Sequence, residues 1–225
     1  MIMSLLVIPF TGRLIKMALG SDKHRLHRTL PGFESIKRYW DKTHDCVAAK
    51  ILPGEYYVSA TNELITTVLG SCISVCIRDP KNGIGGMNHF MLPTDKNVND
   101  TVVSEAARYG NYAMEHMIND ILHYGGERRN LEFKVFGGGK VLDMKMDIGK
   151  KNIDFVFDYL KTESFKVLSE DVGDVYPRKV IFFPISGVAR VKKLKKLHNQ
   201  TIISRENKYL DEIKQAPVSG DIELF

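Results

Sequence analysis

One turn signal constrains the fold of this 225-residue chain more than any other feature. The sequence DPKNG at residues 79–83 stands between two apolar runs, ISVCI at 73–77 and GIGGMNHFML at 83–92. Proline presets the backbone angle φ and Asn-Gly tolerates positive φ, so the segment favours a tight reversal. The two runs are therefore predicted to pair as antiparallel strands.

Apolar spacing predicts two helices. The first begins near Ser104 and ends at Gly125-Gly126, because apolar residues recur there at steps of three and four. The second covers residues 152–163, with the sequence NIDFVFDYLKTE. The expected buried positions are Ala113, Met114, Met117, Ile118, Ile121 and Leu122 in the first helix, and Ile153, Val156, Phe157 and Leu160 in the second.

Short β-rich runs account for the rest of the central region. They are YYV at 56–58, ELITTVL at 63–69, LEFKVFGG at 131–138, FKVLSE at 165–170, RKVIFFP at 178–184 and VARVKKL at 188–194. The order lacks the regular alternation of a Rossmann-type winding. It predicts a layered α/β sandwich with mixed or antiparallel sheets and two main helices.

Composition favours a folded protein in a reducing compartment. The chain is 44% hydrophobic and 26% charged, which is ordinary for a globular protein. Its three cysteines lack CxxC spacing, so we expect no disulfide framework and a cytoplasmic location. The apolar segment at residues 1–10 is shorter than the roughly 20 residues that span a bilayer, and it lacks targeting features. We expect a basic, partly ordered extension over 1–46, a domain over 47–200 and a tail over 201–225.

Positive charge is concentrated at the two ends. Net charge is +5 over residues 1–44, −3 over 45–185 and +3 over 186–225. Such flanks suit an acidic partner, and Lys192, Lys193, Lys195 and Lys196 are the predicted docking residues. No nucleic-acid motif or aromatic platform accompanies them. FGGGKV at 136–141 is not a phosphate-binding P-loop, and the histidines lack metal-ligand spacing, so we expect no cofactor and no metal.

Cys72 and His89 stand at the two ends of the predicted hairpin. A hairpin closed around residues 79–83 places Cys72 opposite residue 89 or 90; alternatively Gly70 ends a strand and Cys72 opens a short helix. An imidazole beside a thiol at the mouth of a pocket makes a nucleophilic thiolate, and N–H groups near Gly70 and Ser71 can stabilise an oxyanion. Asn88 is a further substrate-binding candidate. From spacing alone, a core cysteine and an inert histidine are the commoner interpretation.

A family resemblance changes that balance. The residues TTVLGSC at 66–72 and GIGGMNHFMLP at 83–93 resemble the signature of the chemoreceptor glutamine deamidases, the CheD family. Matching segments follow in order: ARYGNYAMEHMIN at 107–119, FGGGK at 136–140, IGKKNIDFVFDYL at 148–160 and RKVIFFPISG at 178–187. The resemblance covers roughly residues 47–196.

The resemblance implies a protein-glutamine deamidase with a Cys72–His89 centre. It implies Thr66 as the third member of a triad, with the adjacent Thr67 as the alternative, and no cofactor. It also implies a fold similar to the deamidase domain of a bacterial cytotoxic necrotizing factor, cytoplasmic chemoreceptor helices as substrate and a CheC-type phosphatase as partner. The alternatives are a transglutaminase or peptidase with the same chemistry, and a binding module without turnover.

Overall fold

The structure is a computed structural model, and it describes residues 26–93, 105–142, 147–195 and 200–215. The apolar segment at residues 1–10 and Lys196 lie outside these ranges. Within the described part of the chain, no helix has the length and apolar character that crossing a bilayer requires.

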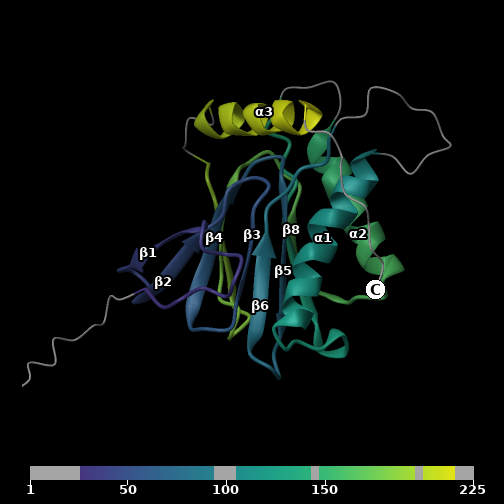
Figure 1. Cartoon of the computed structure of the whole chain (residues 1–225). Coiled ribbons are helices and arrows are strands. Elements are labelled where there is room, and N and C mark those ends of the chain that lie inside the picture. Colours follow the sequence, from purple (N-terminus) through teal and green to yellow (C-terminus); the bar gives the residue numbers. More distant parts are fainter. Residues whose placement is uncertain (1–25, 94–104, 143–146, 196–199, 216–225) are drawn as a thin grey trace, which may run out of the picture.

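Two five-stranded sheets pack face to face (Figure 1). The first has the order β1-β2-β4-β9-β10 and the second β3-β6-β5-β7-β8. Both are mixed, because β2 runs parallel to β4 and β7 parallel to β8. The strands are β1 Lys37–Asp41, β2 Cys46–Lys50, β3 Tyr56–Ser59, β4 Glu63–Leu69, β5 Ile73–Asp79, β6 Ile84–Asn88, β7 Glu132–Gly137, β8 Val167–Val172, β9 Arg178–Phe182 and β10 Ala189–Lys193. The predicted layered α/β architecture is confirmed.

Two helices cover the outer face of the second sheet (Figure 1). They are α1 Glu105–His123, close to its predicted bounds, and α2 Ile148–Thr162, which is capped by Asp147 and begins four residues before the predicted start at 152. A short 3₁₀ turn, Arg128–Asn130, precedes β7. Helix α1 packs on β3, β5 and β6. Of its apolar positions that were predicted to be buried, four are buried and two, Ala113 and Leu122, are partly buried; the buried ones are Met114, Met117, Ile118 and Ile121. The main core therefore lies between the two sheets and continues under these helices.

The hairpin of β5 and β6 has the predicted direction but a register one residue away from the predicted one. Asp79 pairs with Ile84, so the loop has four residues, and the Gly83 N–H donates to the Asp79 carbonyl over 3.0 Å. The Asp79 carboxylate accepts from the backbone N–H groups of Lys81 and Asn82, which tightens the turn. Cys72 therefore lies across from Met91 rather than from residue 89 or 90.

Regular structure extends into both segments predicted as flanks. Strand β1 pairs antiparallel with β2 in the region expected to be a partly ordered extension. A third helix, α3 Gln200–Gln215, forms in the region expected to be a tail. Figure 1 shows α3 lying across one end of the two sheets, near the start of β5 and the end of β4. Helix α3 therefore lies against the segment that contains Cys72.

Candidate active site

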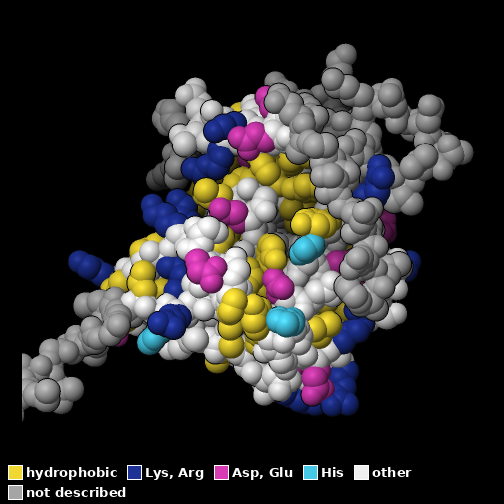
Figure 2. Space-filling view, in the orientation of Figure 1, with side chains coloured by type: hydrophobic (Ala, Val, Ile, Leu, Met, Phe, Trp, Pro, Cys, Tyr) yellow, Lys and Arg dark blue, Asp and Glu magenta, His cyan; other side chains and the backbone are white. Residues whose placement is uncertain are grey.

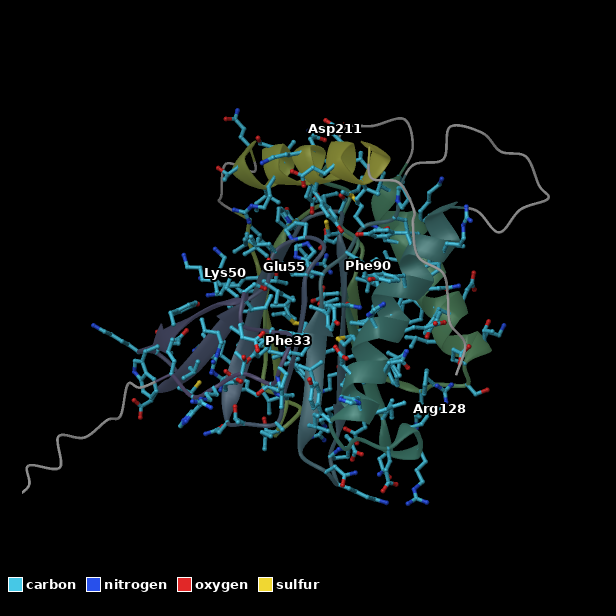
Figure 3. The ribbon with its side chains drawn as sticks, in the orientation of Figure 1. Phe33, Lys50, Glu55, Phe90, Arg128 and Asp211 are labelled. Carbon is cyan, nitrogen blue, oxygen red and sulfur yellow. The ribbon has the colours of Figure 1, made fainter. Side chains whose placement is uncertain are left out.

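The backbone brings Cys72 and His89 to the same side of the β5–β6 hairpin. Beyond the regular strands, Ile73 and Phe90 form one more antiparallel bridge, with N–H···O distances of 2.9 and 3.0 Å. Side chains alternate along strands, so residues 72 and 89 on either side of that bridge are diagonal neighbours on one face. The His89 backbone is held in turn by Gly54 and Glu55. In Figure 3 Glu55 and Phe90 lie below α3.

The His89 imidazole is oriented by Thr67. The distance from His89 Nδ1 to Thr67 Oγ1 is 2.8 Å, and the Thr67 hydroxyl donates to the Ile51 carbonyl over 2.8 Å. A hydroxyl has one proton, so Nδ1–H must be the donor to Thr67, which leaves a lone pair on Nε2. His89 Nε2 is buried and has no hydrogen-bond partner among the described residues. The ring is therefore held in the tautomer that accepts a proton at Nε2.

The orienting threonine is the neighbour of the predicted one. Thr66 directs its hydroxyl to the Val180 carbonyl of β9 over 2.9 Å, inside the first sheet. Adjacent residues of a strand point to opposite faces, so Thr66 and Thr67 of β4 cannot both reach His89. The structure corrects the choice between them: the contact belongs to Thr67.

Three consecutive backbone N–H groups converge at one point. Gly70 N and Cys72 N donate to one carboxylate oxygen of Glu206, over 2.8 and 3.2 Å. Ser71 N and Ser71 Oγ donate to the other, over 2.9 and 2.7 Å. Convergent N–H groups of this kind form an anion-binding site next to the thiol. The N–H groups of Gly70 and Ser71, the predicted oxyanion candidates, belong to this anion-binding site, and their role in stabilising an oxyanion stays a prediction.

The carbonyls of the same three residues are bound on the opposite side. Gly139 N donates to the Gly70 carbonyl over 2.8 Å, and Gly138 N to the Cys72 carbonyl over 2.7 Å. Between them Asn152 Nδ2 of α2 donates to the Ser71 carbonyl over 2.8 Å. The glycine-rich segment after β7 therefore braces the backbone that aims the N–H groups, and this requires the close approach that only glycine permits.

Asn88 does not face the substrate site. Its Oδ1 accepts from Val75 N over 2.8 Å, and its Nδ2 donates to the Ala113 carbonyl over 3.2 Å. Both ends of the amide are thus occupied in joining β5, β6 and α1. The prediction of a substrate-binding role for Asn88 is wrong, because its side chain lies on the face that packs against α1.

Cys72 and His89 are both buried under α3 and both uncharged in this arrangement. The exposed fraction is 0% for Cys72 and 1% for His89, whereas a position at the mouth of a pocket was expected. Burial and the adjacent Glu206 carboxylate raise the pKa of Cys72 well above its usual range. Burial and Arg205 lower the pKa of His89 to about 3. The thiolate that nucleophilic chemistry needs is therefore disfavoured while α3 is in place.

Four residues that contact this site were not predicted from the sequence as its members: Glu206, Asn152, Gly138 and Gly139. A signal for Glu206 does exist, since it stands among apolar residues at helical spacing, where an acid is rare. Among the described residues, no group of three or more His, Cys, Asp or Glu side chains is placed to hold a metal ion.

Comparisons with known proteins identify the family of this chain. Residues 91–193 match the family described as CheD chemotactic sensory transduction. A probable chemoreceptor glutamine deamidase CheD of Halorhodospira halophila is 52% identical over 93% of this chain and all of that relative. Proteins of the same name from Hydrogenovibrio crunogenus and Methylobacillus flagellatus are 53% and 55% identical, over 82% and 83% of this chain and 97% and 94% of theirs. Relatives this similar over nearly their whole length show that the chain belongs to the CheD family.

Proposed function

We propose that this protein hydrolyses the side-chain amide of selected chemoreceptor glutamines, giving glutamate and ammonia. The relatives described above carry the name of that activity. The observation that supports it most directly is the juxtaposition of a thiol, an imidazole with its lone pair on Nε2 and three convergent N–H groups. These are the parts that acyl transfer from an amide requires.

The first half of the reaction forms a thioester. His89 Nε2 takes the proton of the Cys72 thiol, and the thiolate attacks the carboxamide carbon of the glutamine. The oxygen becomes an oxyanion, and the N–H groups of residues 70–72 stabilise it. The imidazolium then returns its proton to the departing ammonia as the C–N bond breaks.

The second half hydrolyses the thioester. His89 removes a proton from water, which attacks the same carbon, and the thiol of Cys72 leaves with the proton that His89 returns. Thr67 touches no reacting atom; it is a positioning residue that keeps Nδ1 protonated and the ring in place. We therefore assign to Thr67 the role that the family resemblance implies for Thr66. We infer that the conversion serves adaptation in chemotaxis.

The test is mass spectrometry of receptor cytoplasmic fragments after incubation with the protein. Wild type is expected to convert specific glutamines to glutamate, and Cys72→Ala and His89→Ala to give none above the rate without protein. Asn88→Ala is a poor control because Asn88 joins three elements, so Cys76→Ala, a second buried thiol, serves instead. Equal conversion by wild type and Cys72→Ala would rule out the mechanism.

Three alternatives give different results in the same assay. A transglutaminase would incorporate an added primary amine at the glutamine instead of releasing ammonia. A binding module without turnover would leave every glutamine unchanged while still binding the receptor fragment. Cleavage of the backbone would identify a peptidase.

The remaining expectations concern surroundings and partners. We infer a cytoplasmic location, which suits three free cysteines, and a CheC-type phosphatase as a regulatory partner. We also infer a relationship between this two-sheet sandwich and the deamidase domain of cytotoxic necrotizing factor. Co-purification of this chain with a CheC-type protein would test the partner.

Basic side chains lie at both edges of the first sheet, and we infer that the β10 edge is the docking surface for an acidic receptor. Figure 2 shows Lys and Arg side chains gathered on the left of the molecule, over the part of the first sheet that contains β1 and β2. The exposed Lys192 lies on β10, the opposite edge strand of the same sheet. We expect Lys192→Glu to raise KM for receptor fragments a few-fold at low salt, with little change in kcat. Lys161→Glu, on α2, is the matched control. An equal effect of the two substitutions on KM would contradict docking at the β10 edge.

A further inference from the structure

Helix α3 carries a single acid in the middle of its buried face. The buried positions follow helical spacing, and an apolar residue occupies each of them except one: Ile202, Glu206, Tyr209, Leu210 and Ile213. Glu206 is only 2% exposed. Burying a carboxylate is costly unless hydrogen bonds replace its water, so its position calls for a specific partner.

The partner of Glu206 is the anion site of the active centre. Its two oxygens accept the N–H groups of residues 70–72 and the Ser71 hydroxyl, and the same carboxylate raises the pKa of the Cys72 thiol. A γ-carboxylate on a helix is the chemical product of deamidating a helical glutamine. Glu206 is thus, atom for atom, the side chain that the proposed reaction would leave in the site.

The surroundings fit the helix as well as the acid. A Cβ on Gly70 would lie 2.7 Å from both carboxylate oxygens, so the absence of a side chain there lets Glu206 reach the backbone. A Cβ on Gly54 would lie 3.0 Å from the ring of Tyr209, and the Tyr209 hydroxyl hydrogen-bonds that of Tyr109 on α1. Gly54 and Gly70 therefore allow α3 to approach the backbone closely, and Tyr109 of α1 adds a hydrogen bond to it.

We propose that α3 is an intramolecular competitor of the substrate, which presents Glu206 as a mimic of the product and must withdraw before a receptor glutamine can enter. This inference rests on the proposed deamidase function for the meaning of the mimicry. That α3 covers the site is argued separately, from the burial of Cys72 and from the hydrogen bonds that join Glu206 to residues 70–72. The surface beneath α3 is accordingly the docking groove for an incoming helix that carries glutamine on its apolar side.

The decisive variant reverses the charge of Glu206 in the full-length chain. In Glu206→Lys an ammonium group, which can only donate, faces N–H groups that also only donate, so α3 should leave its seat. We expect alkylation of Cys72 by iodoacetamide to become at least about tenfold faster than in wild type. The matched control is Glu212→Lys, which makes the same charge change on the exposed face of α3 and should alkylate like wild type.

Two other buried thiols show whether the fold survives. Cys46 and Cys76 lie within strands, so their continued protection in Glu206→Lys distinguishes withdrawal of α3 from general unfolding. If all three thiols react together, a gentler variant, Glu206→Ala, takes its place with the same readout. The proposal would be overturned if Cys72 were alkylated at the same rate in wild type, in Glu206→Lys or Glu206→Ala, and in Glu212→Lys.

Glu206→Gln tests the mimicry itself, because it gives α3 the side chain of a substrate. The Cys72 sulfur would attack the carbonyl carbon of the new amide, ammonia would leave with a proton from His89, and water would release the thioester as Glu206. Mass spectrometry of the peptide that contains residue 206 should show this conversion in the purified protein, and the Cys72→Ala/Glu206→Gln double variant should keep the amide. An unconverted amide in both would overturn the assignment of Glu206 to the substrate position.

The two proposals fail in distinguishable ways. Faster Cys72 alkylation in Glu206→Lys without conversion of any receptor glutamine would support α3 as a cover and contradict the deamidase function. Receptor conversion by wild type with no difference in Cys72 alkylation between Glu206→Lys and Glu212→Lys would support the enzyme and contradict the competitor.

Discussion

Cys72 and Cys76 are both buried, but for different reasons. Cys76 lies inside β5, between β6 and β7, and burial raises its pKa although Lys134 opposes the shift. Cys72 lies at the end of that strand, where one helix covers it and a carboxylate adds to the effect of burial. The fold as a whole protects the first thiol, whereas one element of structure protects the second. Burial alone therefore does not separate a core cysteine from a nucleophile.

The largest expected effect separates the two thiols by activity. Cys72→Ala should lower kcat for receptor deamidation by at least about a thousandfold, because no other group can form the thioester. Cys76→Ala should keep nearly full activity and lose about 1 kcal/mol of unfolding free energy through the small cavity it leaves. Receptor conversion by mass spectrometry and urea unfolding measure the two quantities. Comparable activity losses would remove the distinction drawn here.

The next effect is a difference in alkylation rate between Cys72 and Cys76, because different motions expose the two thiols. Slow alkylation of wild type at low urea should label Cys72 at least about a hundredfold faster than Cys76, because opening one helix costs less than opening a sheet. The Cys72 rate should change little with urea, since little surface is exposed, and the Cys76 rate should rise steeply. Peptide mass spectrometry of the labelled protein gives both rates. Identical urea dependence would mean that only global unfolding exposes Cys72.

A smaller effect concerns the His89 imidazole, which lies near Cys72 and is oriented by Thr67. Thr67→Val should lower kcat about ten- to a hundredfold with little change in KM, because the Nδ1 partner that fixes the tautomer is lost. Thr67→Ser should restore most of the activity. Thr66→Val, one residue away, should stay within a few-fold of wild type although it loses its bond to Val180. Steady-state kinetics of the three variants checks this, and a larger loss for Thr66→Val would return the role to Thr66.

The last effect is a pH dependence of stability, rather than of activity, that His89 contributes. Its folded pKa is about 3, while an unfolded histidine titrates near 6.5. Between these values the unfolded chain binds a proton that the folded chain does not, so unfolding free energy falls as pH falls, by up to about 1.4 kcal/mol per unit. Urea unfolding between about pH 7 and pH 4 should show a shallower fall for His89→Asn and an unchanged one for Cys76→Ala. Parallel curves for His89→Asn and wild type would contradict a buried neutral ring.

Much of the fold could be predicted because its signals are local. The Asp-Pro and Asn-Gly pairs predicted the hairpin. The apolar spacing predicted α1 close to its observed bounds and α2 with a start one turn late. The register was wrong by one residue, because the Asp79 side chain holds a four-residue loop through its own hydrogen bonds. A count of turn residues does not reveal which pair closes a loop.

The site was predicted less completely, because its geometry depends on distant partners. Which of two neighbouring threonines faces His89 depends on how β4 lies between β2 and β9, and no local pattern states it. Asn88 is polar and adjacent to His89, yet strand alternation directs it to α1. Glu206 lies more than a hundred residues from Cys72 in a mostly polar segment, so only its spacing among apolar residues pointed to a buried face.

Because α3 belongs to the same chain as the site that it covers, its competition with a receptor does not depend on the concentration of the protein. A tethered competitor acts at an effective concentration of order millimolar, whatever the dilution of the protein. A receptor free in dilute solution would then displace α3 rarely, whereas receptors crowded together on a surface reach a comparable local density. The conversion would accordingly respond to how densely receptors are assembled, and assays with sparse soluble fragments would underestimate its rate.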